Sequence, residues 1–193
     1  TDTGGEDRFG HRPVDLASFI LTLEYLANHG YHVVSMGDVI RAARRERILP
    51  KRAVLLAFDG GYRSFYDLVF PVLKESGYPC IVSVVTRAVD EQSEGPERAV
   101  MNWDEVREIA GSGLVEIVSA THDLYRKIPY NPFGDCGAAA TSRLCHQDDG
   151  TYETAEAYRQ RVHNDLLTAR RLLEARLGRA PRVLAWPFGA YNA

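Results

Sequence analysis

Three short segments carry the side chains that could do chemistry. The first is Asp59-Gly60-Gly61, which directly follows an apolar run over residues 53–58. The second runs from Ser119 to Asp123 and includes His122, and the third is Trp186-Pro187-Phe188-Gly189. A carboxylate or an imidazole can move a proton or bind a metal ion, and aromatic rings can stack on sugars. These residue types therefore point to acid–base, metal or carbohydrate chemistry.

The elements around these segments alternate between strand and helix. Apolar runs predict strands at residues 31–35, 53–58, 80–85, 115–119 and 182–186. Helical spacing, caps and stop signals predict helices at about 15–30, 37–45, 64–75, 103–110 and 154–178. This alternation predicts an α/β fold with parallel strands that are buried on both faces. In such folds the chemistry gathers where the strands end, and the strand ends here are the three segments together with Thr86-Arg87.

One long stretch interrupts the alternation. Between residues 121 and 152, Pro129, Pro132 and Gly134 break any regular element. Loops of this length inside compact domains are uncommon and usually functional. The stretch contains Cys136 and Cys145, which could form a disulfide or remain two free thiols, and the sequence favours neither state. The third cysteine, Cys80, lies in an apolar run and is expected to be buried.

Length and charge narrow the class of protein. The 193 residues suit one domain, although a full β/α barrel usually needs about 200–250. The 23 basic and 26 acidic side chains give a net charge of −3, which argues against a nucleic-acid partner. No apolar run is long enough to predict a transmembrane segment, and residues 1–10 are too polar for a signal peptide. A signal peptide that had been removed would leave no trace in the sequence, so export of the protein remains possible. The sequence does not indicate any protein partner.

The three segments resemble the motifs of a known family. Ala57-Phe58-Asp59-Gly60-Gly61 resembles the T-F-D-D-G motif of the polysaccharide deacetylases with NodB homology, which form carbohydrate esterase family four. Ser119-Ala120-Thr121 and Tyr125 fall where that family places S-H-T and a second His, and residues 186–189 resemble its W-P-Y-G turn. Residues 61–66 and 152–155 resemble the PgaB-type poly-β-1,6-N-acetylglucosamine N-deacetylases in particular. The resemblance extends from about Asp15 to Asn192.

The resemblance implies both a fold and a setting. The fold would be a distorted NodB-like (β/α) barrel, with residues 1–193 as one partial domain that is incomplete at both ends. The substrate class would be an acetylated amino-sugar polysaccharide, handled as an exopolysaccharide of biofilms. The location would be the cell envelope, the periplasm or the outside of the cell, where Cys136 and Cys145 would form a disulfide.

The family's chemistry depends on a divalent metal such as zinc, held by one Asp and two His. The metal supplies a hydroxide and polarises the amide carbonyl. In this chain Asp59 keeps the position of the general base, but Gly60, Ala120 and Tyr125 stand where the three ligands belong. Losing the metal's effect on the pKa of water, which falls from about 15.7 to about 7, could cost on the order of 11 kcal/mol. We therefore expect no bound cofactor, and a degenerate domain that binds glycan without cleaving it.

Several alternatives stay open at this point. Asp59 is either a former base or a strand-end residue that bonds the following turn. His122 is either a loop histidine that faces solvent or, with Asp59 and Asp123, part of a relocated metal site in an active deacetylase. Tyr62, Trp186 and Phe188 could form a floor for sugar stacking, which His122 and Asp123 would flank, or could simply pack the end of the barrel. The remaining possibility is a scaffold domain with neither function.

Overall fold

The computed structural model describes residues 15–91 and 99–191, so that the polar segment 1–10 and Asn192 lie outside it. The chain divides into two compact units. Unit 1 comprises Thr1–Val82 and Glu94–Ile117, and unit 2 comprises Ser83–Ser93 and Val118–Ala193. The expectation of a single domain over residues 1–193 is not tested by this division, because a contact boundary inside a fold does not by itself separate domains.

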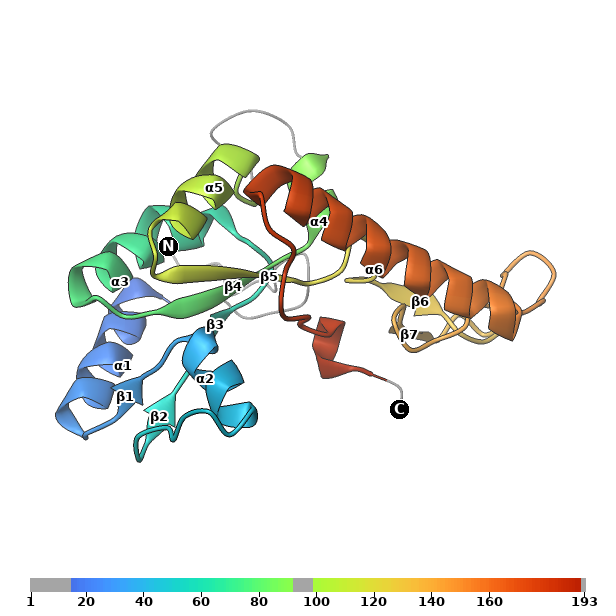
Figure 1. Ribbon diagram of the computed structural model, residues 1–193. Coiled ribbons are helices and arrows are strands. Elements are labelled where there is room, and N and C mark those ends of the chain that lie inside the picture. Colours follow the sequence, from blue (N-terminus) through green and yellow to red (C-terminus); the bar gives the residue numbers. More distant parts are fainter. Residues whose placement is uncertain (1–14, 92–98, 192–193) are drawn as a thin grey trace. The chain divides into compact units, whose positions relative to one another are not determined.

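The helices of unit 1 begin where capping side chains predict them. Helix α1 (Leu16–Asn28) begins after Asp15, whose carboxylate accepts a hydrogen bond from the backbone N–H of Ser18 at 2.9 Å. Reciprocal capping boxes start α2 (Met36–Ala43) and α5 (Trp103–Gly111). The predicted helix at 64–75 is a π-helical turn, η1 (Phe65–Val69), that continues into α3 (Phe70–Ser76). Figure 1 shows α3 and α5 side by side, and the hydroxyl of Tyr66 donates to Glu108 of α5 at 2.7 Å.

The strands confirm a parallel α/β arrangement but correct one prediction. Strand β1 (His32–Val33) pairs in parallel with β2 (Ala53–Val54). A second sheet has the order β3-β4-β5, formed by β3 (Leu56–Phe58), β4 (Cys80–Val84) and β5 (Val115–Ser119). The predicted single strand at 53–58 is therefore two strands, interrupted at residue 55, that belong to different sheets. Closure of these strands into a barrel stays a prediction.

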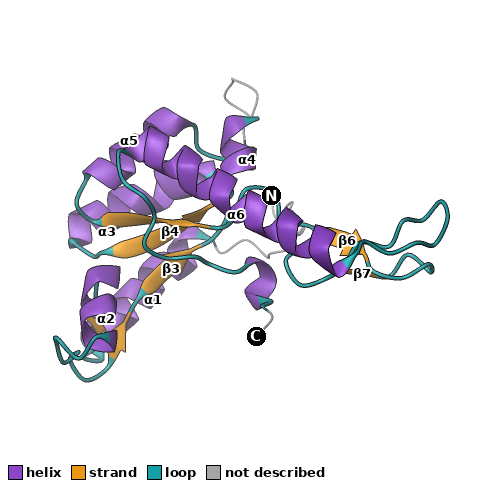
Figure 2. Cartoon of the chain, turned by 45° about the vertical axis from the view of Figure 1, so that its right-hand side comes forward, coloured by secondary structure: helices purple, strands orange, loops and turns teal. Residues whose placement is uncertain are grey.

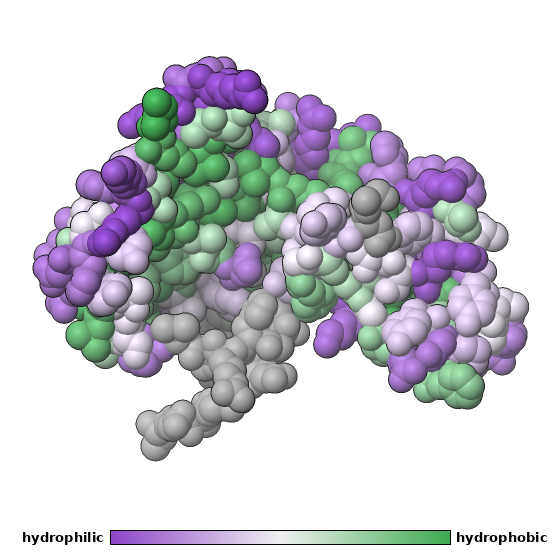
Figure 3. Space-filling model, turned by 90° about the horizontal axis from the view of Figure 1, so that it is seen from below, coloured by the Kyte–Doolittle hydropathy of each residue, from purple (hydrophilic) through white to green (hydrophobic). Residues whose placement is uncertain are grey.

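Burial also differs along the predicted strands. All five residues of β4 are buried, as an apolar strand covered on both faces should be. In β2 and β3 no residue is fully buried, and Ala57 is exposed. Figure 3 shows a broad hydrophobic area on the side of the molecule that faces down in Figure 1.

Unit 2 contains elements that the sequence did not predict. A one-turn helix, α4 (Thr86–Asp90), follows β4 directly. The stretch expected to lack regular structure contains an antiparallel hairpin of β6 (Lys127–Pro129) and β7 (Cys136–Ala138). Figures 1 and 2 both draw this hairpin beside the first half of α6 (Ala155–Leu177). We call residues 126–153 the arm.

Helix α6 begins and ends as predicted. The hydroxyl of Thr154 accepts from the N–H of Ala157 at 3.0 Å, and Gly178 ends the helix in the left-handed conformation. The strand predicted at 182–186 is wrong: its pairing reduces to one parallel bridge between Ser119 and Leu184, followed by the short helix η2 (Pro187–Gly189). Among residues 15–91 and 99–191, no helix combines the length and the apolar composition needed to cross a membrane.

The three cysteines are free thiols in the structure. Cys80 is buried in β4, as expected, and burial raises the pKa of its thiol to about 12. Cys136 is exposed in β7, while Cys145 is buried and its backbone N–H donates to the carbonyl of Pro129. The disulfide that the resemblance implied between Cys136 and Cys145 is therefore not formed.

Candidate functional site

In unit 1, Asp59 and Gly60 form the turn after β3. Asp59 is exposed, whereas Gly60 and Gly61 are buried and left-handed, with φ of 83° and 64°. The turn is tied to a later segment, because the carbonyl of Gly61 accepts from the N–H of Met101 at 2.9 Å and Tyr62 forms a bridge with Val100. The two glycines permit this path, since a side chain at such φ values is strained. The tight turn leaves the carboxylate of Asp59 at the exposed end of the strand.

In unit 2, the turn after β5 has an unusual backbone. Thr121 has φ of 75°, a left-handed conformation that β-branched residues rarely adopt, and it is fully buried. Its carbonyl accepts from the N–H of Thr86 at 3.2 Å, and the carbonyl of His122 accepts from the N–H of Arg87 at 3.2 Å. Among the described residues its own Oγ1 has no hydrogen-bond partner. Strain of this kind persists only where the surroundings enforce it, and it is typical of functional sites.

A carboxylate from α6 holds the same turn. Asp165 accepts hydrogen bonds from two consecutive backbone N–H groups, that of His122 at 2.8 Å to Oδ1 and that of Asp123 at 2.6 Å to Oδ2. Burial raises the pKa of Asp165, and the two N–H groups and His122 oppose that rise. Asp165 was not among the site residues predicted from the sequence. The available signal was its place four residues after Arg161 and four before the buried Ala169, on the inner side of the helix.

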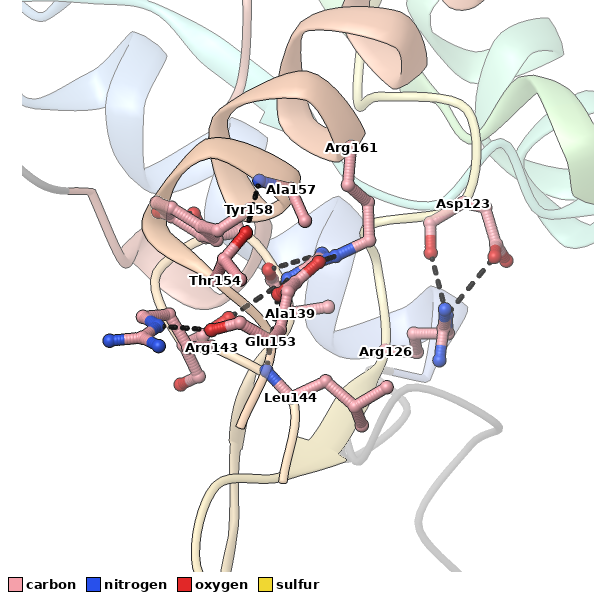
Figure 4. A network of polar contacts seen from close by, with 12 residues as sticks. Asp123, Arg126, Ala139, Arg143, Leu144, Glu153, Thr154, Ala157, Tyr158 and Arg161 are labelled. Atoms are coloured by element: carbon pink, nitrogen blue, oxygen red, sulfur yellow. Dashed lines mark hydrogen bonds and ion pairs between the residues drawn. The ribbon is translucent and has the colours of Figure 1, made fainter. Parts of the chain in front are cut away.

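His122 and Asp123 are both engaged within unit 2. The Nδ1 atom of His122 lies 2.9 Å from Oγ1 of Thr86, and the residue is half-buried. His122 is therefore not a loop histidine that faces solvent, which was one of the two alternatives for this residue. The carboxylate of Asp123 forms ion pairs with Arg87 and Arg126, each at 3.0 Å. Figure 4 shows the pair with Arg126. A carboxylate shared by two guanidinium groups is poorly disposed to bind a metal ion.

Aromatic rings gather beside this turn. The ring of Tyr125 is 7% exposed and packs against Phe188 with a centroid distance of 4.9 Å. Phe188 is itself 38% exposed, and Nζ of Lys127 lies 5.9 Å from its ring centroid. Trp186, two residues earlier, is 36% exposed. A ring that is packed on one side and open on the other provides the surface that a sugar ring stacks on.

The arm is fixed to α6 by a polar network (Figure 4). The guanidinium of Arg161 binds both carboxylate oxygens of Glu153, at 2.8 and 2.9 Å, and donates to the carbonyls of Ala139 and Ser142. The hydroxyl of Tyr158 donates to the carbonyl of Ala140 at 2.6 Å. Beneath it lies a small core of Leu124, Ile128, Ala139 and Ala140. The arm is therefore a fixed part of unit 2 and not a free loop.

The residues at the implied ligand positions do not fit a zinc ion. Gly60 has no side chain, Ala120 offers a fully buried methyl group, and Tyr125 offers a phenol, whose ordinary pKa near 10 makes it a poor ligand at neutral pH. Within the described ranges, His, Cys, Asp and Glu side chains nowhere come together in a group of three that could hold a metal. We therefore derive no chemical step through a metal.

The fold and these turns agree with comparisons to known proteins. The family model described as polysaccharide deacetylase matches residues 46–193, which is most of the chain. The chain belongs to the polysaccharide deacetylase family. This confirms the resemblance that the motifs at Asp59, Ser119 and Trp186 indicated.

Two groups of relatives are similar over most of this chain. The poly-β-1,6-N-acetyl-D-glucosamine N-deacetylase of Escherichia coli K12 is 34% identical over 177 residues, which cover 87% of this chain and 26% of that protein. The chain thus spans about a quarter of the length of that relative. A de-N-acetylase structure from Aggregatibacter actinomycetemcomitans aligns with TM-score 0.87 and 30% identity, covering all of this chain and 77% of the other. The BpsB deacetylase domain from Bordetella bronchiseptica aligns with TM-score 0.83 and 36% identity, covering 96% and 76%.

Proposed function

We propose that this domain binds an acetylated amino-sugar polysaccharide of the poly-N-acetylglucosamine type. The relative from E. coli is named for that polymer, and the chain shares its family. The observation that carries the proposal is the half-exposed ring of Phe188, which is packed against Tyr125 on one side and lies beside Lys127. Such a ring stacks on the C–H face of a pyranose, and a nearby ammonium group can donate to sugar hydroxyl or acetyl oxygens.

We propose further that the domain does not hydrolyse the acetamide by the family's metal-dependent route. Asp59 keeps the carboxylate of a general base, but general-base help is typically worth 10²–10⁴-fold, far less than the metal supplies. The positions assigned to the ligands by resemblance hold Gly60, Ala120 and Tyr125. Glycan binding without cleavage, in the cell envelope or outside the cell, is the role that these residues support.

The active alternative receives less support. A relocated metal at Asp59, His122 and Asp123 would have to draw the carboxylate of Asp123 away from Arg87 and Arg126. It would also have to compete with Thr86 for the imidazole of His122, unless Nε2 were the ligand. Acetate release that requires added zinc and disappears in His122→Ala would establish this alternative and overturn the non-hydrolytic part of the proposal.

Calorimetric titration with β-1,6-linked N-acetylglucosamine oligosaccharides tests binding. We expect Phe188→Ala and Trp186→Ala each to weaken the affinity by roughly tenfold, because each removes one stacking surface. Tyr25→Ala is the matched control, since Tyr25 is an exposed aromatic residue on α1 of unit 1. Binding by the parent that neither site variant changes would place the glycan elsewhere. No binding by the parent at millimolar concentration would leave the scaffold role.

A further inference from the structure

We infer that Asp165 is a positioning residue, which holds the turn after β5 in the one arrangement that binds glycan. The inference deepens the proposed function and rests on it for the identity of the ligand. Asp165 itself is not expected to touch the sugar, because both of its carboxylate oxygens are occupied by backbone N–H groups of the protein. It acts through the backbone of His122 and Asp123.

The two hydrogen bonds to Asp165 have a defined geometry. Two consecutive N–H groups point at the two oxygens of one carboxylate, at 2.8 and 2.6 Å, across 42 and 43 residues of sequence. Hydrogen bonds to an ionised acceptor are shorter and stronger than neutral ones. A pair of them fixes both the position and the orientation of the peptide planes at His122 and Asp123.

The contact with Asp165 opposes backbone strain at Thr121. The left-handed backbone of Thr121 is strained and needs support on both sides. The β4–α4 turn supplies one side, through the N–H groups of Thr86 and Arg87. Asp165 supplies the other side, immediately after the strained residue. Without Asp165, the turn would lose both hydrogen bonds to α6. It would keep the contacts to the β4–α4 turn, the bond from the N–H of Thr121 to the hydroxyl of Ser119 and the pair of Asp123 with Arg126, and could relax.

The turn after β5 is directly connected to the proposed binding surface. Tyr125, which supports the ring of Phe188, follows Asp123 by only two residues. Leu124 between them is 2% exposed and belongs to the small core under the arm. A shift of the backbone at Asp123 would therefore move Tyr125, and with it the support of the proposed stacking ring. The placement of that ring depends on a carboxylate that lies on α6.

Asp165→Asn tests the inference, because it keeps the shape but presents one carbonyl oxygen and one N–H₂ group to two N–H donors. We expect amide hydrogen exchange at His122 and Asp123, measured by NMR, to become at least tenfold faster, with Leu173 in α6 as an internal reference. Oligosaccharide affinity should fall by about tenfold. Glu174→Gln, an exposed carboxylate on the same helix, is the matched control and should change neither quantity.

The outcomes separate this inference from the proposed function. Unchanged exchange at His122 and Asp123 in Asp165→Asn would overturn the inference, whatever the glycan affinity. Faster exchange with unchanged affinity would also overturn it, because the turn would then not position the binding surface. A parent protein that binds no oligosaccharide refutes the proposed function and, with it, the positioning role for glycan. The exchange data would in that case show whether Asp165 merely stabilises the turn.

Discussion

The side chain of Arg161 lies between α6 and the end of the arm and binds Glu153 through two parallel hydrogen bonds. The Nε to Oε1 distance is 2.8 Å and the Nη2 to Oε2 distance is 2.9 Å. Only 10% of the Glu153 side chain is exposed, and its other contacts include the N–H of Leu144. The pair is partly withdrawn from water, so its loss should lower the free energy of unfolding more than the loss of a surface ion pair would.

We predict that Glu153→Gln lowers the free energy of unfolding by about 2 kcal/mol, since it removes the charge from a bidentate pair. For a domain of this size that corresponds to a fall in Tm of roughly 4–8 °C. Thermal unfolding followed by circular dichroism measures it. Glu156→Gln is the control, because Glu156 pairs with Arg159 on the surface and should matter by less than about 0.5 kcal/mol. Equal effects of the two variants would contradict the prediction.

The effect of Glu153→Gln should depend on pH in a definite direction. Hydrogen bonding to Arg161 holds the pKa of Glu153 below its ordinary value of 4.5. A lowered pKa in the folded state means that the carboxylate stabilises the fold above pH 4.5, and that this contribution is lost as the pH falls through the folded pKa. The difference between parent and variant should therefore shrink below pH 4.5. Urea unfolding at pH 7 and pH 3.5 decides it, and a constant difference would refute the assignment.

We predict that the parent holds no stoichiometric zinc after dialysis against the metal, and that Gly60→Asp, Ala120→His and Tyr125→His together create zinc binding. The structure indicates that two of these substitutions destabilise the fold. Gly60 has φ of 83°, so Asp there is strained by about 1 kcal/mol or more, and Ala120 is fully buried, so His overpacks the site by about 1–3 kcal/mol. The triple variant should be less stable without zinc and should regain stability with it.

Thermal unfolding with and without zinc compares the parent, the three single variants and the triple variant. Only the triple variant should show a zinc-dependent rise in Tm, because a single new ligand cannot hold the ion. If the triple variant does not respond to zinc, the alignment of Ala120 and Tyr125 with the family's histidines is wrong. If the parent binds one equivalent that is lost in His122→Ala, the relocated metal site gains support.

The thiols should differ sharply in reactivity. Cys136 is exposed, whereas Cys145 is buried and Cys80 is buried with a pKa raised to about 12. Because the thiolate is the nucleophile, alkylation at pH 8 should modify Cys136 alone in the native protein and all three after unfolding. Mass spectrometry of the unreduced protein counts the modified thiols. A mass two hydrogen atoms lower, restored by reductant, would show that a disulfide forms in solution after all.

The longer helices could be predicted from the sequence because their signals are local, whereas the five-residue helix α4 was not predicted. Asp15, Asn102 and Thr154 cap helices through bonds that span three residues, and Gly77 and Gly178 end helices by their left-handed backbone. Pairing between strands is not local. The apolar run at 53–58 contains no sign that its two halves join different sheets. The hydrophobicity of this run predicted a strand, but it could not predict which strand each half pairs with.

The hairpin and the contact of Asp165 could not be predicted from local sequence signals either. Pro129, Pro132 and Gly134 argued against regular structure, but Pro129 lies in a two-stranded hairpin, where every strand is an edge and proline is tolerated. The motifs located the turns at Asp59 and at His122 because each turn follows a strand directly. They could not locate Asp165, since its contact joins residues 42 and 43 positions apart. An acidic residue on the inner side of an amphipathic helix was the one available sign.

The spacing of Arg161 and Asp165 has a consequence for how this family of sequences can change in length. The two residues are four apart and so lie on one side of α6, where one holds the arm and the other holds the turn after β5. One residue inserted between them would rotate the helix by about 100° and misplace one of the two contacts. The exposed segment 146–149 at the end of the arm has no such restriction, because its ends are already fixed by Cys145 and Glu153. Insertions and deletions should therefore accumulate in the arm and be absent from the middle of α6.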